Sequence, residues 1–172
     1  MMEEEFFDIV DEMDRVVDRA KREDVHRSGQ LHRSTHLLVF DNSGRVLLQK
    51  RSPEKDTFPG RWDSSVSGHV DSGEGYDQCI VREAKEEIGI ELTGRPEKLF
   101  KIDACEETAE EFTWVYRTLS DGPFLANEQE ISEIRWFAIE EVDRQLVTRN
   151  ESFSPAFALV WERMREDGHL ER

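Results

Sequence analysis

The sequence predicts an α+β domain built around a mixed β-sheet. A chain of 172 residues with 37% apolar side chains is long enough to bury one core, and no repeat or linker divides it. Several short apolar runs end at turn residues, which is typical of strands, and two longer segments have helical periodicity. Strands and helices do not alternate as strict βαβ units, which favours α+β over α/β. We therefore expect a single domain over residues 1–172.

The expected strands are short apolar segments. They are Phe6–Val10, His36–Phe40, Val46–Gln49, Phe112–Leu119 and Ile134–Phe137. The Asp41–Gly44 segment has the composition of a hairpin turn. It should therefore join the second and third strands as an antiparallel pair.

Two helices are expected, over Tyr76–Ile88 and Pro155–Glu166. Apolar residues recur at helical spacing in both, at Tyr76, Ile80, Ala84 and Ile88 in the first and at Phe157, Val160, Trp161 and Met164 in the second. Ser154 and Pro155 suit the N-cap and the first position of the second helix. Each helix should therefore pack one face against the sheet.

The chain is acidic, with 39 Asp and Glu against 23 Lys and Arg and a formal charge of −16. Such a surface repels nucleic-acid polymers and anionic membranes. No secretion signal or apolar run long enough to span a bilayer is evident, so we expect a cytoplasmic protein. Cys79 and Cys105 have no metal-binding spacing and should be reduced and half-buried.

An acidic cluster lies on the first helix. Glu83, Glu86 and Glu87 are spaced i, i+3 and i+4, so their carboxylates converge and repel one another. A divalent cation offsets such repulsion, and Mg²⁺ prefers hard oxygen ligands of this kind. On composition alone, a solvated acidic face is the simpler interpretation of three glutamates in a Glu-rich chain.

The wider segment Gly68–Ile90 resembles the signature of the Nudix hydrolases. The matching positions are Gly68, Glu74, Arg82, Glu83, Glu86, Glu87 and Gly89. Seven specified residues at average usage would match by chance roughly once in a million trials. Ala84 is smaller than the bulky apolar residue often found at its position. The resemblance implies the Nudix fold, in which helices enclose a mixed sheet.

The resemblance also implies roles for these residues. Glu83, Glu86 and Glu87 would bind the metal, with the carbonyl of Gly68 as a further ligand, and the ion would be Mg²⁺ or Mn²⁺. Catalysis would rest on Glu86, Glu87 and Arg82, and Arg82 would hold the glutamates while Glu74 pairs with it. The implied reaction is hydrolysis of a diphosphate by water, helped by the metal. The base would be one of the three glutamates or an outside carboxylate such as Glu111, Glu130 or Glu133.

Segments outside the signature look like the branch that includes isopentenyl-diphosphate isomerase. They are Leu31–His36, Leu47–Arg51, Pro59–Asp63 and Ser67–His69. The isomerases need a cysteine where this chain has Ser67, and a hydroxyl is too weakly acidic to replace a thiol there. Their paired glutamates would correspond to Glu111 and Ala109. His32 and His69 match their metal-binding histidines, and His26 matches a third imperfectly.

We therefore expect a pyrophosphohydrolase on an isomerase-like scaffold, acting on a nucleoside diphosphate derivative or a similar small organic diphosphate. The alternatives are an isomerase of prenyl diphosphates and a nucleotide-binding regulator without turnover. Arg51, Lys55, Arg61 and His69 are the candidate substrate-binding residues, since cations assist diphosphate binding. For His32 and His69, a role as neutral scaffold residues stays open. We expect a monomer or a homodimer.

Overall fold

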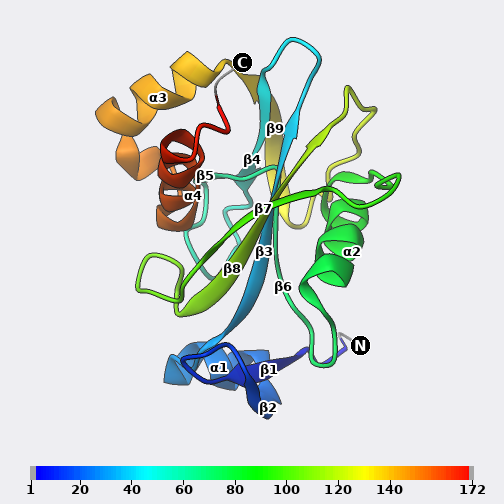
Figure 1. Ribbon diagram of the computed structural model, residues 1–172, viewed down its shortest axis with the longest axis vertical. Coiled ribbons are helices and arrows are strands. Elements are labelled where there is room, and N and C mark those ends of the chain that lie inside the picture. The colour runs from blue at the N-terminus through cyan, green and yellow to red at the C-terminus, as the bar shows by residue number, and fades with distance from the viewer. Residues whose placement is uncertain (1–2, 171–172) are drawn as a thin grey trace.

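The computed structural model describes residues 3–170, so residues 1–2 and 171–172 of the expected domain lie outside the described residues. Figure 1 shows a twisted sheet with helices on both sides and a small hairpin below it. The strands are β1 Phe6–Val10, β2 Val16–Lys21, β3 His32–Phe40, β4 Val46–Arg51, β5 Trp62–Asp63, β6 Val66–His69, β7 Glu97–Ile102, β8 Glu111–Leu119 and β9 Ile131–Phe137. The helices are α1 Arg22–Ser28, α2 Tyr76–Ile88, α3 Ile139–Thr148 and α4 Pro155–Glu166, with a 3₁₀ turn at Asn150–Ser152.

The main sheet is mixed, as predicted. Its order is β5-β4-β3-β8-β7, with β6 paired to β3 and β9 paired to β4. The β3 and β8 strands are parallel over their whole length, from His32 opposite Glu111 to Phe40 opposite Leu119. The other pairs in this sheet are antiparallel. The β3 strand is therefore the centre of the sheet, and its first residue lies beside the first residue of β8.

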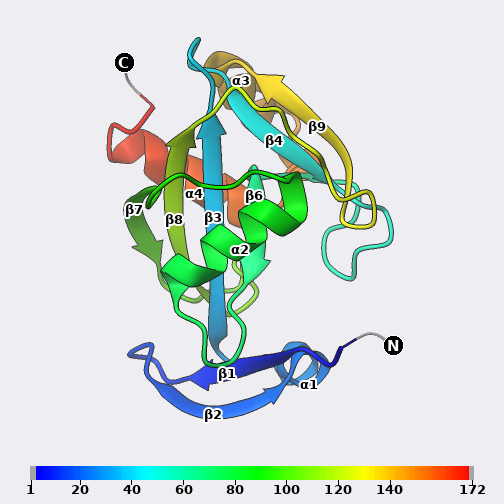
Figure 2. The ribbon, with the colours of Figure 1, turned by 90° about the vertical axis from the view of Figure 1, so that its right-hand side faces the viewer.

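Both faces of β3 are covered, which explains why nearly all of its residues are buried and why Leu37–Phe40 is an unbroken apolar run. Leu38 and Phe40 face the core that α4 closes, whereas Leu37 and Val39 face the core that α2 closes. Figure 2 shows α2 crossing in front of the sheet and α4 behind it. The two helices thus define two cores with β3 between them.

The helix bounds predicted from periodicity are confirmed for both α2 and α4. Ser154 caps α4, because its hydroxyl accepts the backbone N–H of Phe157 at 3.1 Å. The α2 helix ends at Gly89, which has a left-handed φ of 70°. A Cβ at Gly89 would also lie only 3.0 Å from the side chain of Leu125. Conformation and space both require glycine at the end of α2.

Several elements carry too weak a pattern to be predicted. The β2 strand is almost entirely exposed, so it lacks the alternation that marks a half-buried strand. The β5 and β6 strands have two and four residues, and α1 has seven. The β1, β2 and α1 elements lie together at one end of the sheet (Figures 1 and 2).

The cysteines and the lengths of the helices bear on two further predictions. Both cysteines are free, but Cys79 is fully buried rather than half-buried, because it points from α2 toward Thr35 on the sheet. Between residues 3 and 170, no helix combines the length and the apolar character that crossing a bilayer requires.

Candidate active site

The site begins where β6 leads into the loop before α2. Gly68 on β6 lies against Glu83 of α2, and a Cβ at Gly68 would fall 2.2 Å from the carboxyl carbon of Glu83. No side chain fits there without displacing the carboxylate. The first glycine of the signature is therefore required by the position of Glu83, and it places the backbone of residue 68 next to that carboxylate.

Arg82 binds the acidic side chains around it. Its Nε and Nη2 donate to the two carboxylate oxygens of Glu74 at 2.8 and 2.9 Å. Its Nη1 donates to Glu83 at 2.9 Å and to Glu86 at 3.0 Å, and Nη2 also donates to the carbonyl of His69 at 3.1 Å. The bidentate pair with Glu74 raises the pKa of Arg82 well above its usual range. Arg82 thus fixes the loop, the helix and β6 relative to one another.

Glu87 is the most buried of the three glutamates, with 7% of its surface exposed. Its Oε2 accepts hydrogen bonds from the side chain of Gln49 at 2.8 Å and from the backbone N–H of Ser67 at 3.0 Å. Burial, and then the negative charge of Glu83, raise the pKa of Glu87. Burial likewise raises the pKa of Glu83, despite its contact with Arg82. Two carboxyls with raised pKa values form an oxygen-rich site that a divalent cation would stabilise.

A second cluster of possible metal ligands lies next to the first. His26 of α1, His32 of β3, His69 of β6 and Glu111 of β8 each offer one atom, and these four atoms all lie within 4.8 Å of one another. Nε2 of His69 is 2.8 Å from Oε1 of Glu111 and 3.3 Å from Nε2 of His26. Four elements therefore converge on one point at the end of the sheet.

The hydrogen bonding of His32 directs its other ring nitrogen into this cluster. Its Nδ1 lies 2.8 Å from the carbonyl of Gln30, so Nδ1 carries a proton and donates it to that carbonyl. Within residues 3–170 the buried Nε2 has no hydrogen-bond partner, and it faces Oε1 of Glu111 at 3.3 Å. A ring nitrogen and a carboxylate oxygen that face each other in a buried site are ligand atoms for a cation.

The charges in the histidine cluster also favour a bound cation. Burial, together with the charges of His69 and His32, lowers the pKa of His26 to about 4, so His26 is neutral at neutral pH. Burial opposes the ionisation of Glu111, but the neighbouring histidines hold its pKa well below the usual range. A neutral imidazole at His26 and an ionised carboxylate at Glu111 are the protonation states in which these two groups bind metal.

Phe7 of β1 forms one wall of the histidine cluster. Its ring is stacked on His32 at 5.7 Å and on His69 at 4.8 Å between centroids, and its side chain is 1% exposed. The packing restricts both imidazoles to one orientation. The hairpin of β1 and β2 is therefore part of the site.

The two clusters meet at residues 67–69. The N–H of Ser67 binds Glu87, Gly68 lies against Glu83, and the side chain of His69 binds Glu111. A ligand that spans the two clusters would pass over this short strand.

Two of the candidate substrate-binding residues, Arg51 and Lys55, are engaged in contacts with other side chains. Arg51 pairs with Asp63 at 3.3 Å and donates to the carbonyl and hydroxyl of Thr57. Lys55 pairs with Glu130. Of the four candidate substrate-binding residues, His69 is the one whose contacts lie within the two clusters.

Arg61 lies near the start of α4, and Ala109, the expected counterpart of the second isomerase glutamate, lies outside β8. The guanidinium of Arg61 covers the ring of Phe58 and donates to the carbonyl of Phe153, before α4. Ala109 lies in a turn with a φ of 55°, outside β8, so the residue that shares a face with Glu111 is Thr113, two positions further along the strand.

Gln49 and the backbone N–H of Ser67 were not predicted to bind a glutamate. Gln49 follows the apolar residues Val46–Leu48 and precedes two cations, Lys50 and Arg51, and nothing in this pattern indicates a glutamate as its partner. Only the packing of β4 beside α2 brings it to Glu87.

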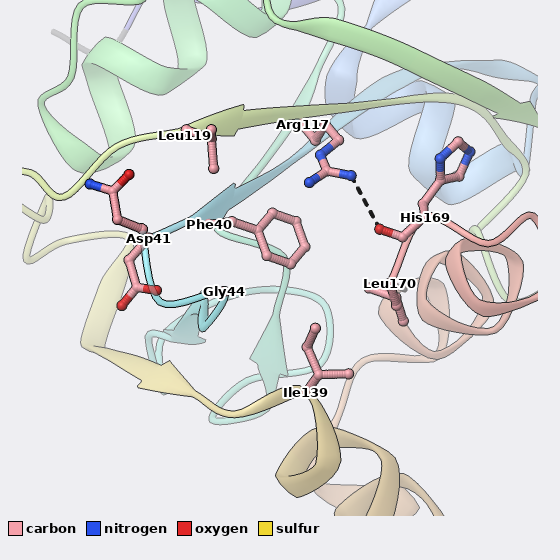
Figure 3. A pocket seen from close by; sticks show the side chains of 9 residues that line it. Phe40, Asp41, Gly44, Arg117, Leu119, Ile139, His169 and Leu170 are labelled. Carbon is pink, nitrogen blue, oxygen red and sulfur yellow. Dashed lines mark hydrogen bonds between the residues drawn. The ribbon is translucent and has the colours of Figure 1, made fainter. Parts of the chain in front are cut away.

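Two cavities lie away from both clusters. One of about 270 Å³ lies at the opposite end of β3, near Phe40, and Arg117, Leu119, Ile139 and Leu170 line it (Figure 3). Arg117 donates there to the carbonyl of His169 at 3.1 Å. The other, of about 230 Å³, lies between β7 and α4. Neither contains a residue of the two clusters.

Comparison with known proteins identifies the fold and the family. The NUDIX domain family model matches residues 30–157. An uncharacterised Nudix hydrolase of Yersinia pestis is 35% identical over 156 residues, which is 88% of this chain and 80% of that protein. A prenyl-diphosphate phosphatase of Methanosarcina mazei is 34% identical over 151 residues, which is 86% of this chain and 87% of that protein.

A solved structure agrees with this result. The protein DR0079 of Deinococcus radiodurans has a TM-score of 0.82 and 29% identity, over 92% of this chain and 98% of that one. The mixed sheet between helices is thus the Nudix fold, as expected. With the intact signature around Arg82 and Glu87, the chain belongs to the Nudix family and is a pyrophosphohydrolase.

Proposed function

We propose that the protein hydrolyses the diphosphate linkage of a small organic diphosphate or a nucleoside diphosphate derivative, and that Mg²⁺ is its metal. The observation that carries the proposal is the pair of buried carboxyls, Glu83 and Glu87, with raised pKa values beside the backbone of Gly68. A bound divalent ion would supply charge neutralisation of the phosphoryl oxygens. The prenyl-diphosphate phosphatase of M. mazei supports prenyl diphosphates as the first class to assay.

In this mechanism the chain's own residues hold the metal and keep it in place. Glu83, Glu86 and Glu87 would bind it, with the carbonyl of Gly68. Arg82 orients Glu83 and Glu86, and Gln49 together with the N–H of Ser67 orients Glu87. Because these contacts come from the sheet and from α2, the carboxylates are arranged before substrate arrives.

The histidine cluster is proposed as a second metal site. Three imidazoles and one carboxylate suit Mn²⁺, Zn²⁺ or iron better than Mg²⁺. After loading with Mn²⁺ or Zn²⁺ and gel filtration, the wild-type protein should retain about one ion that His69→Ala and Glu111→Gln do not retain. Equal metal content in all three proteins would contradict this assignment.

The test of function is a phosphate-release screen over prenyl diphosphates, nucleoside diphosphate sugars, dinucleotides, nucleoside di- and triphosphates and coenzyme A. Glu87→Gln should lose at least about 100-fold in kcat, because it removes a metal ligand and a charge. Glu91→Gln is the matched control, since Glu91 is exposed beyond the end of α2 and pairs only with Lys85. Wild-type rates in Glu87→Gln would overturn the metal assignment.

The isomerase alternative has its own assay. The histidine cluster favours it, whereas Ser67 occupies the position at which the isomerases carry their cysteine. Formation of allylic product from isopentenyl diphosphate in Mg²⁺ or Mn²⁺ would establish it. Release of phosphate with no allylic product would leave hydrolysis as the reaction.

A further inference from the structure

A chain of buried polar side chains extends from the junction of the two clusters into the sheet. His36 and Ser67 are cross-strand partners on β3 and β6. Nε2 of His36 lies 3.2 Å from the hydroxyl of Ser67, and Nδ1 lies 2.8 Å from the hydroxyl of Ser64. Oδ1 of Asp63 lies 3.8 Å from the same Nδ1. His36 is 2% exposed and Ser67 is partly exposed, so the Ser67 hydroxyl links the imidazole to the site.

Asp63 lies on the Nδ1 side of His36 and favours one tautomer of the imidazole. Asp63 is itself fixed, because Oδ1 accepts the N–H of Ser64 at 2.8 Å and Oδ2 pairs with Arg51 at 3.3 Å. A carboxylate on the Nδ1 side of a buried imidazole favours the proton on Nδ1. Nε2 then carries the lone pair and accepts the O–H of Ser67. The order of hydroxyl, imidazole and carboxylate is that of a serine, histidine and aspartate triad, but here Ser64 is the hydrogen-bond partner of Nδ1 and Asp63 lies further away, at 3.8 Å.

His36 is a proton acceptor in this arrangement. The charged and titratable groups that face it are Asp63 on β5, Arg51 on β4, His69 on β6 and Glu111 on β8. Burial lowers the pKa of His36 against the opposing effect of Asp63 and Glu111. A neutral imidazole with a free lone pair can take up a proton but has none to give from Nε2. The direction of transfer is therefore from the site toward His36.

Ser67 lies at the junction of the two clusters. Its backbone N–H binds Glu87, and the next two residues contact Glu83 and Glu111. On the proposed function, Glu83, Glu86 and Glu87 would hold the metal to which the diphosphate binds, and residue 67 is in contact with one of them. The side chain of Ser67 shares the face of β6 with His69, so its hydroxyl is on the side of the histidine cluster.

We propose that Ser67 and His36 form a proton relay for the water that attacks the diphosphate. The inference rests on the proposed function. The water oxygen bonds to phosphorus while the bridging P–O bond breaks, and its electron pair leaves with the departing phosphate. One water proton passes to Oγ of Ser67 as the serine proton passes to Nε2 of His36. The imidazolium then returns a proton through the same hydroxyl to the departing phosphate. Ser67 is thus a catalytic residue, and His36 acts through it.

The first experiment needs no substrate. In Ser67→Cys the thiol would face Nε2 of His36, and a histidine partner lowers a thiol pKa below its usual value of about 8.5. Alkylation of residue 67 by iodoacetamide at pH 7, followed by peptide mass spectrometry, should therefore be about 10-fold faster in Ser67→Cys than in Ser67→Cys with His36→Gln. Resolving peptides separates residue 67 from Cys79 and Cys105.

The matched control is Ser132→Cys, an exposed position on β9. Its alkylation rate should be the same with and without His36→Gln. If His36→Gln leaves the rate at residue 67 equally unchanged, the contact between the two side chains has no chemical consequence and the proposal is overturned.

The second experiment is kinetic. Ser67→Ala and His36→Gln should each lower kcat by about 100-fold or more with little change in KM, the range that general base catalysis contributes. Ser67→Thr keeps the hydroxyl and should retain most of the activity that Ser67→Ala loses. His36→Gln should also remove the loss of kcat on the acidic side of the pH profile. Thermal melts and circular dichroism check that each variant is folded.

The outcomes separate the relay from the function on which it rests. A wild-type protein that hydrolyses a diphosphate while Ser67→Ala keeps the same kcat would overturn the relay and leave the function standing. A wild-type protein inactive on every diphosphate would overturn the function, and the alkylation rates would still test the contact between Ser67 and His36.

Discussion

Gly68 shows how one residue without a side chain organises the acidic cluster. The carboxylate of Glu83 occupies the space that any larger residue at position 68 would need. Arg82 and the backbone of residue 68 therefore hold Glu83 from two sides. The signature residues are linked by contact, because Gly68 makes room for the carboxylate that Arg82 then fixes.

This contact predicts the effect of adding one methyl group. Gly68→Ala should displace Glu83 and lower kcat by about 10-fold or more, since small misplacements of a site residue have effects of this size. Gly75→Ala is the control in the same loop, because Gly75 has a φ of −92° and a Cβ there would meet only the side-chain oxygen of Gln78, at 3.6 Å. Equal activity in the two variants, measured as phosphate release, would contradict this account of Gly68.

At the scale of elements, the N-terminal hairpin is attached to the domain through Asp14. This residue is in the turn between β1 and β2, with 9% of its side chain exposed. Its carboxylate accepts hydrogen bonds from Arg33 on β3, Tyr76 on α2 and Lys101 on β7. The hairpin carries Phe7, so the same anchor keeps the wall of the histidine cluster in place.

Asp14→Asn should lower the free energy of unfolding by about 1–3 kcal/mol, the usual size for hydrogen bonds to a charged group. Asp18→Asn is the control, on the exposed face of β2 in the same hairpin. Contacts with the three donors hold the pKa of Asp14 below its usual value of 3.8, although burial opposes them. The stabilisation is thus present above pH 4 and is lost as the pH falls through the lowered pKa. Urea melts at pH 7 and pH 3 should show a large and a small difference between Asp14→Asn and wild type.

At the scale of the whole molecule, the charge of −16 has two parts. Glu83, Glu86 and Glu87 form a local site, and a bound cation would reverse the field there before an anionic substrate arrives. Most of the remaining acidic residues lie on the surface, where they keep the protein soluble. The acidity of the site itself therefore predicts dependence on a divalent metal.

Because the pKa values of Glu83 and Glu87 are raised, the stabilisation of the fold by a divalent metal should depend on pH. A carboxyl whose pKa is higher in the folded state than in the unfolded state destabilises the fold as the pH rises between the two values. For Glu87 the window runs from the ordinary 4.5 to about 8. Mg²⁺ should offset that loss, so it should raise Tm more at pH 8 than at pH 5.5.

Mg²⁺ should raise Tm by more similar amounts at pH 8 and pH 5.5 in Glu87→Gln, because that variant has no charge at residue 87 to compensate. In Glu91→Gln the difference between the two pH values should persist. Differential scanning fluorimetry of the metal-free proteins with and without Mg²⁺ measures it. An equal Mg²⁺ effect at the two pH values in wild type would show that the metal does not bind these carboxylates.

The sequence by itself determined what depends on local spacing. The bounds of β1, α2 and α4 follow from apolar patterns and from caps such as Ser154. The acidic cluster is also local, because the helical repeat places residues three and four apart on one face whatever the rest of the chain does.

Only the tertiary structure decided the rest. The histidine cluster draws on α1, β3, β6 and β8, and its register depends on the parallel pairing of His32 with Glu111, which are far apart in the chain. The same pairing brings Thr113, and not Ala109, to the face that Glu111 occupies. The β3 and β8 strands are parallel and far apart in the chain, so no hairpin turn sets their pairing as Asp41–Gly44 does for β3 and β4.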